Sequence, residues 1–214
     1  MSNHYEFFRF LGGIDGGELL RGAYRAYKLA DGGSAFVLND ELKRGSALNE
    51  ELGQLSENLE KVICAENTEP IVLYRMTSDV EFGRLTEAQS GEPFTYPAFM
   101  STSGRDNNLS AFVPGRGRAL LVEIHCPPGT RMALLEEDGG MEDEYLLGHG
   151  TLFRGIGFSE VRDQDSLAKY LGVGSDQKML LWLKLEVIQN PPYTSALVSF
   201  PFEKDDFADE VEYV

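Results

Sequence analysis

Three consecutive acidic residues, Glu142, Asp143 and Glu144, follow a glycine pair and precede a strand-like apolar run. Side chains two residues apart on an extended chain point to the same side, so Glu142 and Glu144 are expected to face one space and Asp143 another. Two carboxylates in one cleft repel, so one stays ionised while the other takes up a proton. Such a pair suits a reaction in which positive charge develops on a sugar carbon. Alone, however, an acidic triplet is more typical of a solvated loop.

Two other apolar runs end in polar residues that can bind a ligand. The run from Ile71 ends at Arg75, whose planar guanidinium is suited to bind a phosphate or to brace a neighbouring backbone. The second run ends in the hydroxyls of Ser101, Thr102 and Ser103, which are costly to bury unless each has a hydrogen-bond partner. Each feature also has a simpler explanation, a surface ion pair for the arginine and an edge strand for the hydroxyls.

Phe112 lies in the segment 104–117, which is rich in Gly and Asn. An aromatic side chain there can stack on a flat heterocycle, although a loop anchor explains it as well. For each of these residues taken singly, the structural explanation outweighs the functional one. The functional argument rests on their combination and order.

The elements that must position these residues fall into a helical first third and a β-rich remainder. Helix-forming composition and apolar residues at three- and four-residue steps predict helices over about 18–30, 36–44 and 48–63. After Pro70 come short apolar or alternating runs between turn residues, which are typical of strands. The order indicates an α+β fold in a single domain. Its expected parts, within residues 1–214, are a helical region at about 18–66, a β-rich core at about 70–188 and an acidic tail at about 201–214.

In this order, the motifs resemble the Arg / Ser-Thr-Ser / Glu-x-Glu signature of the mono-ADP-ribosyltransferases, most closely the bacterial toxin and effector branch. The resemblance covers about Tyr24 to Arg154 and extends to about Ile188. It implies an α+β ADP-ribosyltransferase-like fold with N-terminal helices packed on a two-sheet β core that holds an NAD cleft. The matching motifs are Leu-Asn-Asp-Glu-Leu-Lys-Arg-Gly at 38–45, Leu-Tyr-Arg at 73–75, Ser-Thr-Ser at 101–103, Glu-Asp-Glu at 142–144, Leu-Leu at 146–147 and Gly-Thr-Leu-Phe-Arg at 150–154.

The resemblance implies transfer of ADP-ribose from NAD to a side chain of a target protein, with release of nicotinamide. Glu144 would bond the 2′-hydroxyl of the nicotinamide ribose and stabilise the oxocarbenium, and Glu142 would orient and deprotonate the acceptor. Ser101 would bond the same ribose and hold Glu144, while Arg75 would bind the diphosphate and fix the strands. A glutamate at position 142 favours arginine as the acceptor.

Further contacts to NAD are implied on the other sides of the cleft. Phe112 would stack on nicotinamide, and Asn39, with Tyr24 or Tyr27, would line the helical side. Thr102 and Ser103 would support the ends of the strands.

The chain departs from the family pattern in two places. Met76 follows Arg75 where a second arginine is common, so Arg116 is the candidate for another phosphate contact. Next to the catalytic loop, Leu-Gly-His-Gly at 147–150 stands where the family often has Leu-Leu-Pro-Arg-Gly. His149 in this segment is expected to be structural or solvent-facing, with a minor role in acceptor choice left open.

Two other functions stay open at the level of the sequence. One is an NAD glycohydrolase that uses the same site with water as the acceptor. The other is a non-catalytic acidic module that binds a basic protein. For a transferase, a GTPase, actin and ubiquitin are all compatible targets, and the chain is expected to act as a monomer.

Acidic residues outnumber basic ones by 35 to 19, which gives a net charge of −16. This charge repels nucleic-acid phosphates and anionic membranes, so neither is expected as a partner. Residues 136–144 contribute six acids and no base, and residues 203–212 contribute six acids and one lysine. Part of the charge therefore belongs to the predicted catalytic pair, beside which an anionic dinucleotide needs a cation such as Arg75.

Cys64 and Cys126 are far apart, which indicates two small buried hydrophobes rather than a disulfide or a zinc site, and no metal is expected. The sequence has no glycine-rich strand-to-helix fingerprint of the Rossmann kind. It shows no secretory signal and no apolar run long enough for a membrane helix. We therefore expect synthesis in a bacterial cytosol, followed by export into a target cell through a specialised secretion system.

Overall fold

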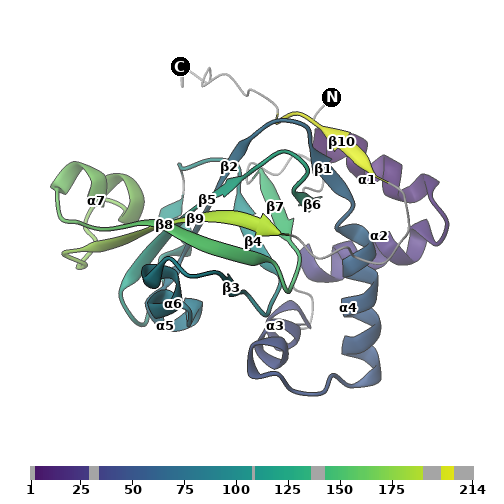
Figure 1. Cartoon of the computed structure of the whole chain (residues 1–214), viewed down its shortest axis with the longest axis horizontal. Coiled ribbons are helices and arrows are strands. Elements are labelled where there is room, and N and C mark those ends of the chain that lie inside the picture. The colour runs from purple at the N-terminus through teal and green to yellow at the C-terminus, as the bar shows by residue number, and fades with distance from the viewer. Residues whose placement is uncertain (1–2, 29–33, 108, 136–142, 190–198, 205–214) are drawn as a thin grey trace.

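The computed structural model describes residues 3–28, 34–107, 109–135, 143–189 and 199–204. Among these residues, the helices before the first strand are α1 (Asn3–Gly13), α2 (Gly17–Lys28), α3 (Ser34–Arg44) and α4 (Glu50–Val62). They gather at one end of the molecule (Figure 1). Helices α2, α3 and α4 confirm the three helices predicted from the sequence.

Helix α1 lies in a segment for which no element is predicted. It buries His4, Phe7 and Leu11, whose spacing of three and four residues places them on one helical face. The glycine-rich segment 11–17, expected as a break, supplies the end of α1 and the first residue of α2. The sequence therefore contains the apolar spacing of a helix in this segment, but its aromatic residues and the glycines that follow do not favour a helix.

The strands of the described residues form one hydrogen-bonded sheet in the order β10-β1-β6-β7-β4-β2-β5-β9-β8-β3. This arrangement confirms the α+β class. The strands are β1 (Ala65–Asn67), β2 (Ile71–Ser78), β3 (Phe94–Thr95), β4 (Met100–Ser103), β5 (Ala119–Cys126), β6 (Arg131–Leu135), β7 (Glu144–Leu147), β8 (Leu152–Val161), β9 (Leu180–Gln189) and β10 (Phe200–Phe202).

The sheet has two halves that meet between β4 and β2. These two strands share a single register pair, Tyr74 with Ser103. By contrast, β2 pairs with β5 at every position from Ile71 to Ser78. The two sheets expected from the sequence are therefore two halves of one sheet, connected by this narrow contact, which we call the joint.

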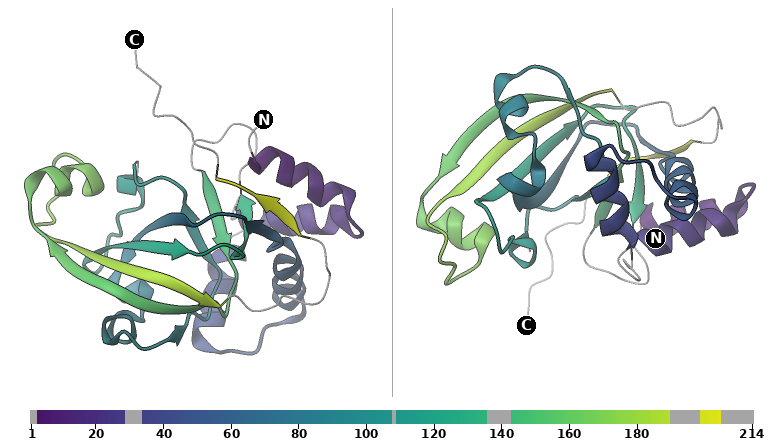
Figure 2. Two further views of the ribbon diagram at one scale, coloured as in Figure 1. Left: turned by 45° about the horizontal axis from the view of Figure 1, so that its top comes forward. Right: turned by 90° about the horizontal axis from the view of Figure 1, so that it is seen from below.

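Short helices and a 3-10 turn accompany the half of the sheet formed by β2, β5, β9, β8 and β3. None of them is predicted from the sequence. They are α5 (Asp79–Phe82), α6 (Leu85–Ser90), α7 (Gln164–Leu171) and the 3-10 turn η2 (Leu109–Phe112). Strands β8 and β9 run side by side as long twisted strands that lead to α7 (Figure 2). Asp163 caps α7, because its side chain accepts the N–H of Ser166 at 2.9 Å. Helix α7 in turn packs against η2.

The segment expected as an acidic tail begins inside the sheet. Strand β10 pairs in parallel with β1, and Phe202 is buried and stacked on Tyr145. Asn3 donates a hydrogen bond to the main-chain oxygen of Glu203, and Lys204 donates one to that of Gly104. The first residues of this segment are thus structural, while its acids at 205–214 lie outside the described residues.

Cys64 and Cys126 are both buried, as expected. Burial raises the pKa of the Cys64 thiol to about 12, so this thiol stays protonated at neutral pH. In the part of the chain that the structure describes, no helix has the length and apolarity needed to cross a membrane.

Candidate active site

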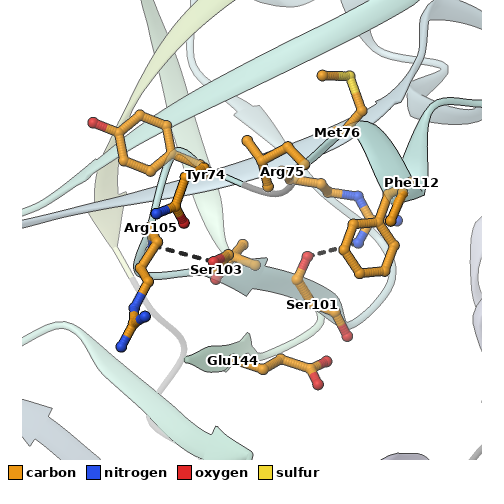
Figure 3. Close-up of a pocket in the computed structure, with 12 residues that line it drawn as sticks. Tyr74, Arg75, Met76, Ser101, Ser103, Arg105, Phe112 and Glu144 are labelled. Atoms are coloured by element: carbon orange, nitrogen blue, oxygen red, sulfur yellow. Dashed lines mark hydrogen bonds between the residues drawn. The ribbon is translucent and has the colours of Figure 1, made fainter. Parts of the chain in front are cut away.

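A pocket of about 330 Å³ lies at the joint of the sheet. Side chains from β2, β4, β7 and the η2 turn reach it (Figure 3). It brings together residues predicted from distant parts of the sequence, namely Arg75, Ser101, Thr102, Phe112 and Glu144. It also includes residues that were not predicted, among them Tyr74, Arg105 and Asn107.

Arg75 stands on β2 and reaches across the joint. Its Nη1 atom donates a hydrogen bond to the main-chain oxygen of Ser101 on β4, at 2.7 Å. Because the two strands share only one register pair, this side-chain bond helps to hold them together. The guanidinium has five N–H donors and also lines the pocket, where it can bind an anion.

The Ser-Thr-Ser motif forms β4, so its side chains alternate between two faces. Thr102 is buried, and its hydroxyl donates to the main-chain oxygen of Tyr145 on β7 at 2.8 Å. Ser101 and Ser103 are partly exposed, and the Ser103 hydroxyl accepts the N–H of Arg105 at 3.1 Å. Thr102 therefore ties two strands of the site together, and all three residues of the motif line the pocket.

Glu144 is the first residue of β7 and pairs in register with Ser103. Its Oε2 atom accepts a hydrogen bond from Nζ of Lys28, the last residue of α2, at 2.5 Å. Its main-chain oxygen lies 3.1 Å from Nε2 of His4 on α1. Neither Lys28 nor His4 is predicted, because sequence separations of 116 and 140 residues leave no local signal. The other proposed catalytic carboxylate, Glu142, lies outside the described residues.

Asp143, the residue between the two glutamates, turns into the protein. It is buried, and its φ of 44° is unfavourable for a residue with a Cβ. The N–H of Gly104 donates to its main-chain oxygen at 2.8 Å, and a Cβ at Gly104 would lie only 2.1 Å from its carboxylate. His4 Nε2 and Arg105 Nε lie 3.7 Å and 4.0 Å from the same carboxylate. Asp143, directly before Glu144, is thus closely held, and a side chain at position 104 would have to displace it.

Asn39 is not among the described residues that line the pocket, although it is predicted to contact NAD. Its Nδ2 atom donates to the Tyr27 hydroxyl at 2.9 Å, and its Oδ1 atom accepts the N–H of Phe99 at 3.1 Å. The Tyr27 hydroxyl also hydrogen-bonds Ser101, and burial raises the pKa of Tyr27. Asn39 and Tyr27 therefore support the strand that carries Ser101, whereas Tyr24 is fully buried in the core.

A second cation in the pocket is Arg105 rather than the predicted Arg116. Arg105 lines the pocket, whereas Arg116 is exposed and lies outside the lining. Both arginines follow the Ser-Thr-Ser motif in one loop, so sequence position alone does not tell which one turns inward. The structure shows which one does, because the main-chain N–H of Arg105 donates to the Ser103 hydroxyl at 3.1 Å and its Nε lies 4.0 Å from the Asp143 carboxylate.

Phe112 belongs to η2 and lines the pocket with 54% of its surface exposed. The η2 turn packs against β2 and α7, so the ring is carried by an ordered segment. Its stacking on nicotinamide stays a prediction.

His149 faces α4. Its Nε2 atom lies 2.5 Å from a carboxylate oxygen of Glu60, and its ring packs edge-on against Phe99. These contacts agree with a structural role. Within the described ranges, no group of three or more His, Cys, Asp or Glu side chains is arranged to hold a metal ion.

Solved structures are similar to this chain, whereas no model of a protein family and no curated protein matches it. The ADP-ribosylating toxin BECa of a C. perfringens binary enterotoxin, solved with NADH, has a TM-score of 0.63 and 22% identity over 86% of this chain and 46% of that one. An ADP-ribosyltransferase from Clostridium botulinum, solved in a triclinic form, has a TM-score of 0.57 and 12% identity over 86% of this chain and 92% of that one. Exoenzyme S from Pseudomonas aeruginosa, solved with human 14-3-3 protein beta and carba-NAD, has a TM-score of 0.55 and 14% identity over 83% and 80%.

These similarities show the fold. The chain has the fold of the bacterial ADP-ribosyltransferase toxins, as the sequence motifs predict. It spans about half the length of BECa and of the enzymatic component of the C2 toxin, with 46% and 44% of those chains covered.

Proposed function

We propose that this chain, on its ADP-ribosyltransferase toxin fold, transfers ADP-ribose from NAD to a side chain of a target protein and releases nicotinamide. The observation that carries the proposal is the convergence of Arg75, Ser101 and Glu144, from three different strands, on one pocket. Similar structures solved with NADH and carba-NAD add support.

The pocket offers the chemical groups that this reaction needs. Arg75 and Arg105 can pair with the diphosphate, because guanidinium groups match phosphate oxygens in geometry and charge. Phe112 offers an exposed ring to nicotinamide, and Ser101 a hydroxyl to the ribose. Glu144 places a negative charge in a mostly buried site, where it can stabilise positive charge that develops on the ribose as nicotinamide leaves.

The acceptor and the setting of the reaction belong to the same proposal. Glu142 would orient and deprotonate the acceptor, and this role rests on the Glu-x-Glu motif. Its glutamate favours an arginine acceptor in a host protein, with a GTPase, actin or ubiquitin as compatible targets. The chain would then act as a toxin or effector that a secretion system delivers into the target cell.

The central test replaces Glu144 by glutamine, which keeps the size of the side chain and removes its charge. We expect Glu144→Gln to lower both nicotinamide release and labelling of lysate protein by a tagged NAD analogue, by about 10²- to 10³-fold. Thermal shift should show that the variant still binds NAD. The matched control is Glu57→Gln on the exposed face of α4, which should retain wild-type activity.

Other outcomes distinguish the rival functions. If wild-type protein neither releases nicotinamide nor labels a target, or if Glu144→Gln is as active as wild type, the transferase proposal fails. Nicotinamide release without labelling in several lysates would identify an NAD glycohydrolase. Binding of a basic protein without any NAD-dependent thermal shift would identify a non-catalytic module.

A further inference from the structure

The pair formed by Lys28 and Glu144 is unlike an ordinary surface ion pair. The Nζ and Oε2 atoms are 2.5 Å apart, and each side chain is only 16% exposed. Both charged groups have therefore lost most of their hydration. Only a close and well-placed contact between them offsets the free-energy cost of that desolvation. Lys28 is the last residue of α2, where the helix dipole favours a cation. An ammonium group extended into water would satisfy the dipole equally well, so the dipole does not explain the contact with Glu144.

The residue before Lys28 reaches the same site. The Tyr27 hydroxyl hydrogen-bonds Ser101 on β4, while Lys28 binds Glu144 on β7. The last turn of α2 thus contacts both strands that carry the proposed ribose-binding groups. Helix α2 is itself firmly placed, since it packs against α1 and α4 and its Tyr24 is fully buried.

Lys28 binds the Glu144 carboxylate without belonging to the described lining of the pocket, whereas Glu144 lines it. A carboxylate has two oxygens, so the bond from Lys28 to Oε2 leaves the second oxygen to serve a ligand. The same glutamate is held at its main-chain oxygen by His4. Backbone and side chain of Glu144 are thus fixed by two different helices.

We propose that Lys28 is a positioning residue that sets the orientation of the Glu144 carboxylate for the transfer step. This inference rests on the proposed function. Lys28 acts through Glu144 rather than on the substrate, so its loss should change turnover rather than binding. Arg75 and Phe112, which would bind NAD, are carried by β2 and η2 rather than by α2.

The test measures kcat and KM for NAD in nicotinamide release. Lys28→Met keeps an unbranched side chain, one heavy atom shorter, and removes its charge. We expect it to lower kcat by about tenfold to hundredfold, with KM within about twofold of wild type. Lys28→Arg, which can pair with the same carboxylate, should keep kcat within about threefold. Lys61→Met, an exposed lysine on α4, is the matched control and should leave both constants unchanged.

A double variant separates positioning from a general effect on the fold. If Lys28 acts only through Glu144, adding Lys28→Met to Glu144→Gln should change the residual rate by less than about twofold. Circular dichroism monitors folding, and Lys28→Gln replaces Lys28→Met if the latter does not fold.

Several results would overturn the inference. The first is a Lys28→Met variant whose kcat is unchanged or higher than that of wild type. The second is a variant with a raised KM and a normal kcat. The third is a decrease in kcat that is just as large when Lys28→Met is added to Glu144→Gln. A wild-type protein without any nicotinamide release would instead remove the proposed function itself, and this inference with it. An active wild type with an equally active Lys28→Met removes the inference alone.

Discussion

Phe112 offers the pocket an aromatic face that is more than half exposed. Stacking of a base on an aromatic side chain is worth about 1–3 kcal/mol, so Phe112→Ala should raise KM for NAD by about tenfold. We expect kcat to change less, because Glu144 is untouched. Steady-state kinetics of nicotinamide release measure both constants.

The control for this prediction is Phe36→Ala. Phe36 is an exposed phenylalanine on α3 that does not belong to the described lining of the pocket. Its replacement should leave KM unchanged. Equal KM values in the Phe112 and Phe36 variants would contradict a stacking role.

Residues that carry chemistry were readable from the sequence, whereas residues that hold them in place were not. Arg75, Ser101 and Glu144 stand in motifs whose order is characteristic, and the structure places them in one pocket. Lys28 reaches Glu144 only because α2 docks on the sheet, and no local pattern encodes that docking. Arg105, which lines the pocket, was not singled out from the sequence, and the phosphate contact of Arg116, which is not among the described lining residues, stays a prediction.

At the scale of single elements, Gly155 on β8 is required by the close approach of α6. A Cβ at this position would lie 1.7 Å from the main-chain oxygen of Ala88. Gly155→Ala must therefore displace backbone, and we expect it to lower the free energy of unfolding by about 1–3 kcal/mol. Urea or thermal denaturation measures this change.

The same strand supplies the control. A Cβ at Gly157 would meet the Lys184 side chain at an ordinary 3.5 Å. Gly157→Ala should therefore change the free energy of unfolding by less than about 1 kcal/mol. If both alanine variants lose the same stability, crowding by α6 is not the reason for glycine at position 155.

Elements with a long apolar repeat were predictable, and short ones were not. Helix α4 has leucines at regular steps along one face, so its sequence alone identifies it. Strands β1, β3 and β10 have two or three residues each, too few for an alternation to show. In β10, moreover, Phe200 and Phe202 belong to the sheet, but the acidic residues that follow them favoured the prediction of a tail.

The stability of the whole molecule should depend on pH through Glu123 on β5. This buried carboxylate accepts hydrogen bonds from Lys184 at 3.0 Å and Trp182 at 2.9 Å, and His125 lies 2.7 Å away. Burial by itself would raise the pKa of Glu123, but these contacts outweigh it and lower the pKa in the folded protein. A lowered pKa stabilises the fold above the ordinary glutamate value of about 4.3, and this stabilisation is lost as the pH falls through the folded-state value.

Glu123→Gln should therefore destabilise the protein more at pH 7 than at pH 3. At pH 7 we expect a loss of about 1–3 kcal/mol in the free energy of unfolding, and a smaller loss at pH 3. Denaturant titrations at both pH values measure it. For comparison, Glu57→Gln on the exposed face of α4 should stay within about 0.5 kcal/mol of wild type at each pH. A loss for Glu123→Gln that does not vary with pH would contradict the prediction.

The joint of the sheet divides the proposed ligand contacts between the two halves of the sheet. Arg75 on β2 and Phe112, whose turn packs on β2, belong to one half, whereas Ser101 on β4 and Glu144 on β7 belong to the other. A dinucleotide that touches all four would cross-link the two halves of the sheet. By thermodynamic reciprocity, whatever favours the bound arrangement of the two halves raises affinity, and a bound ligand favours that arrangement by the same free energy. A substitution at the joint that never touches the ligand can therefore weaken its binding.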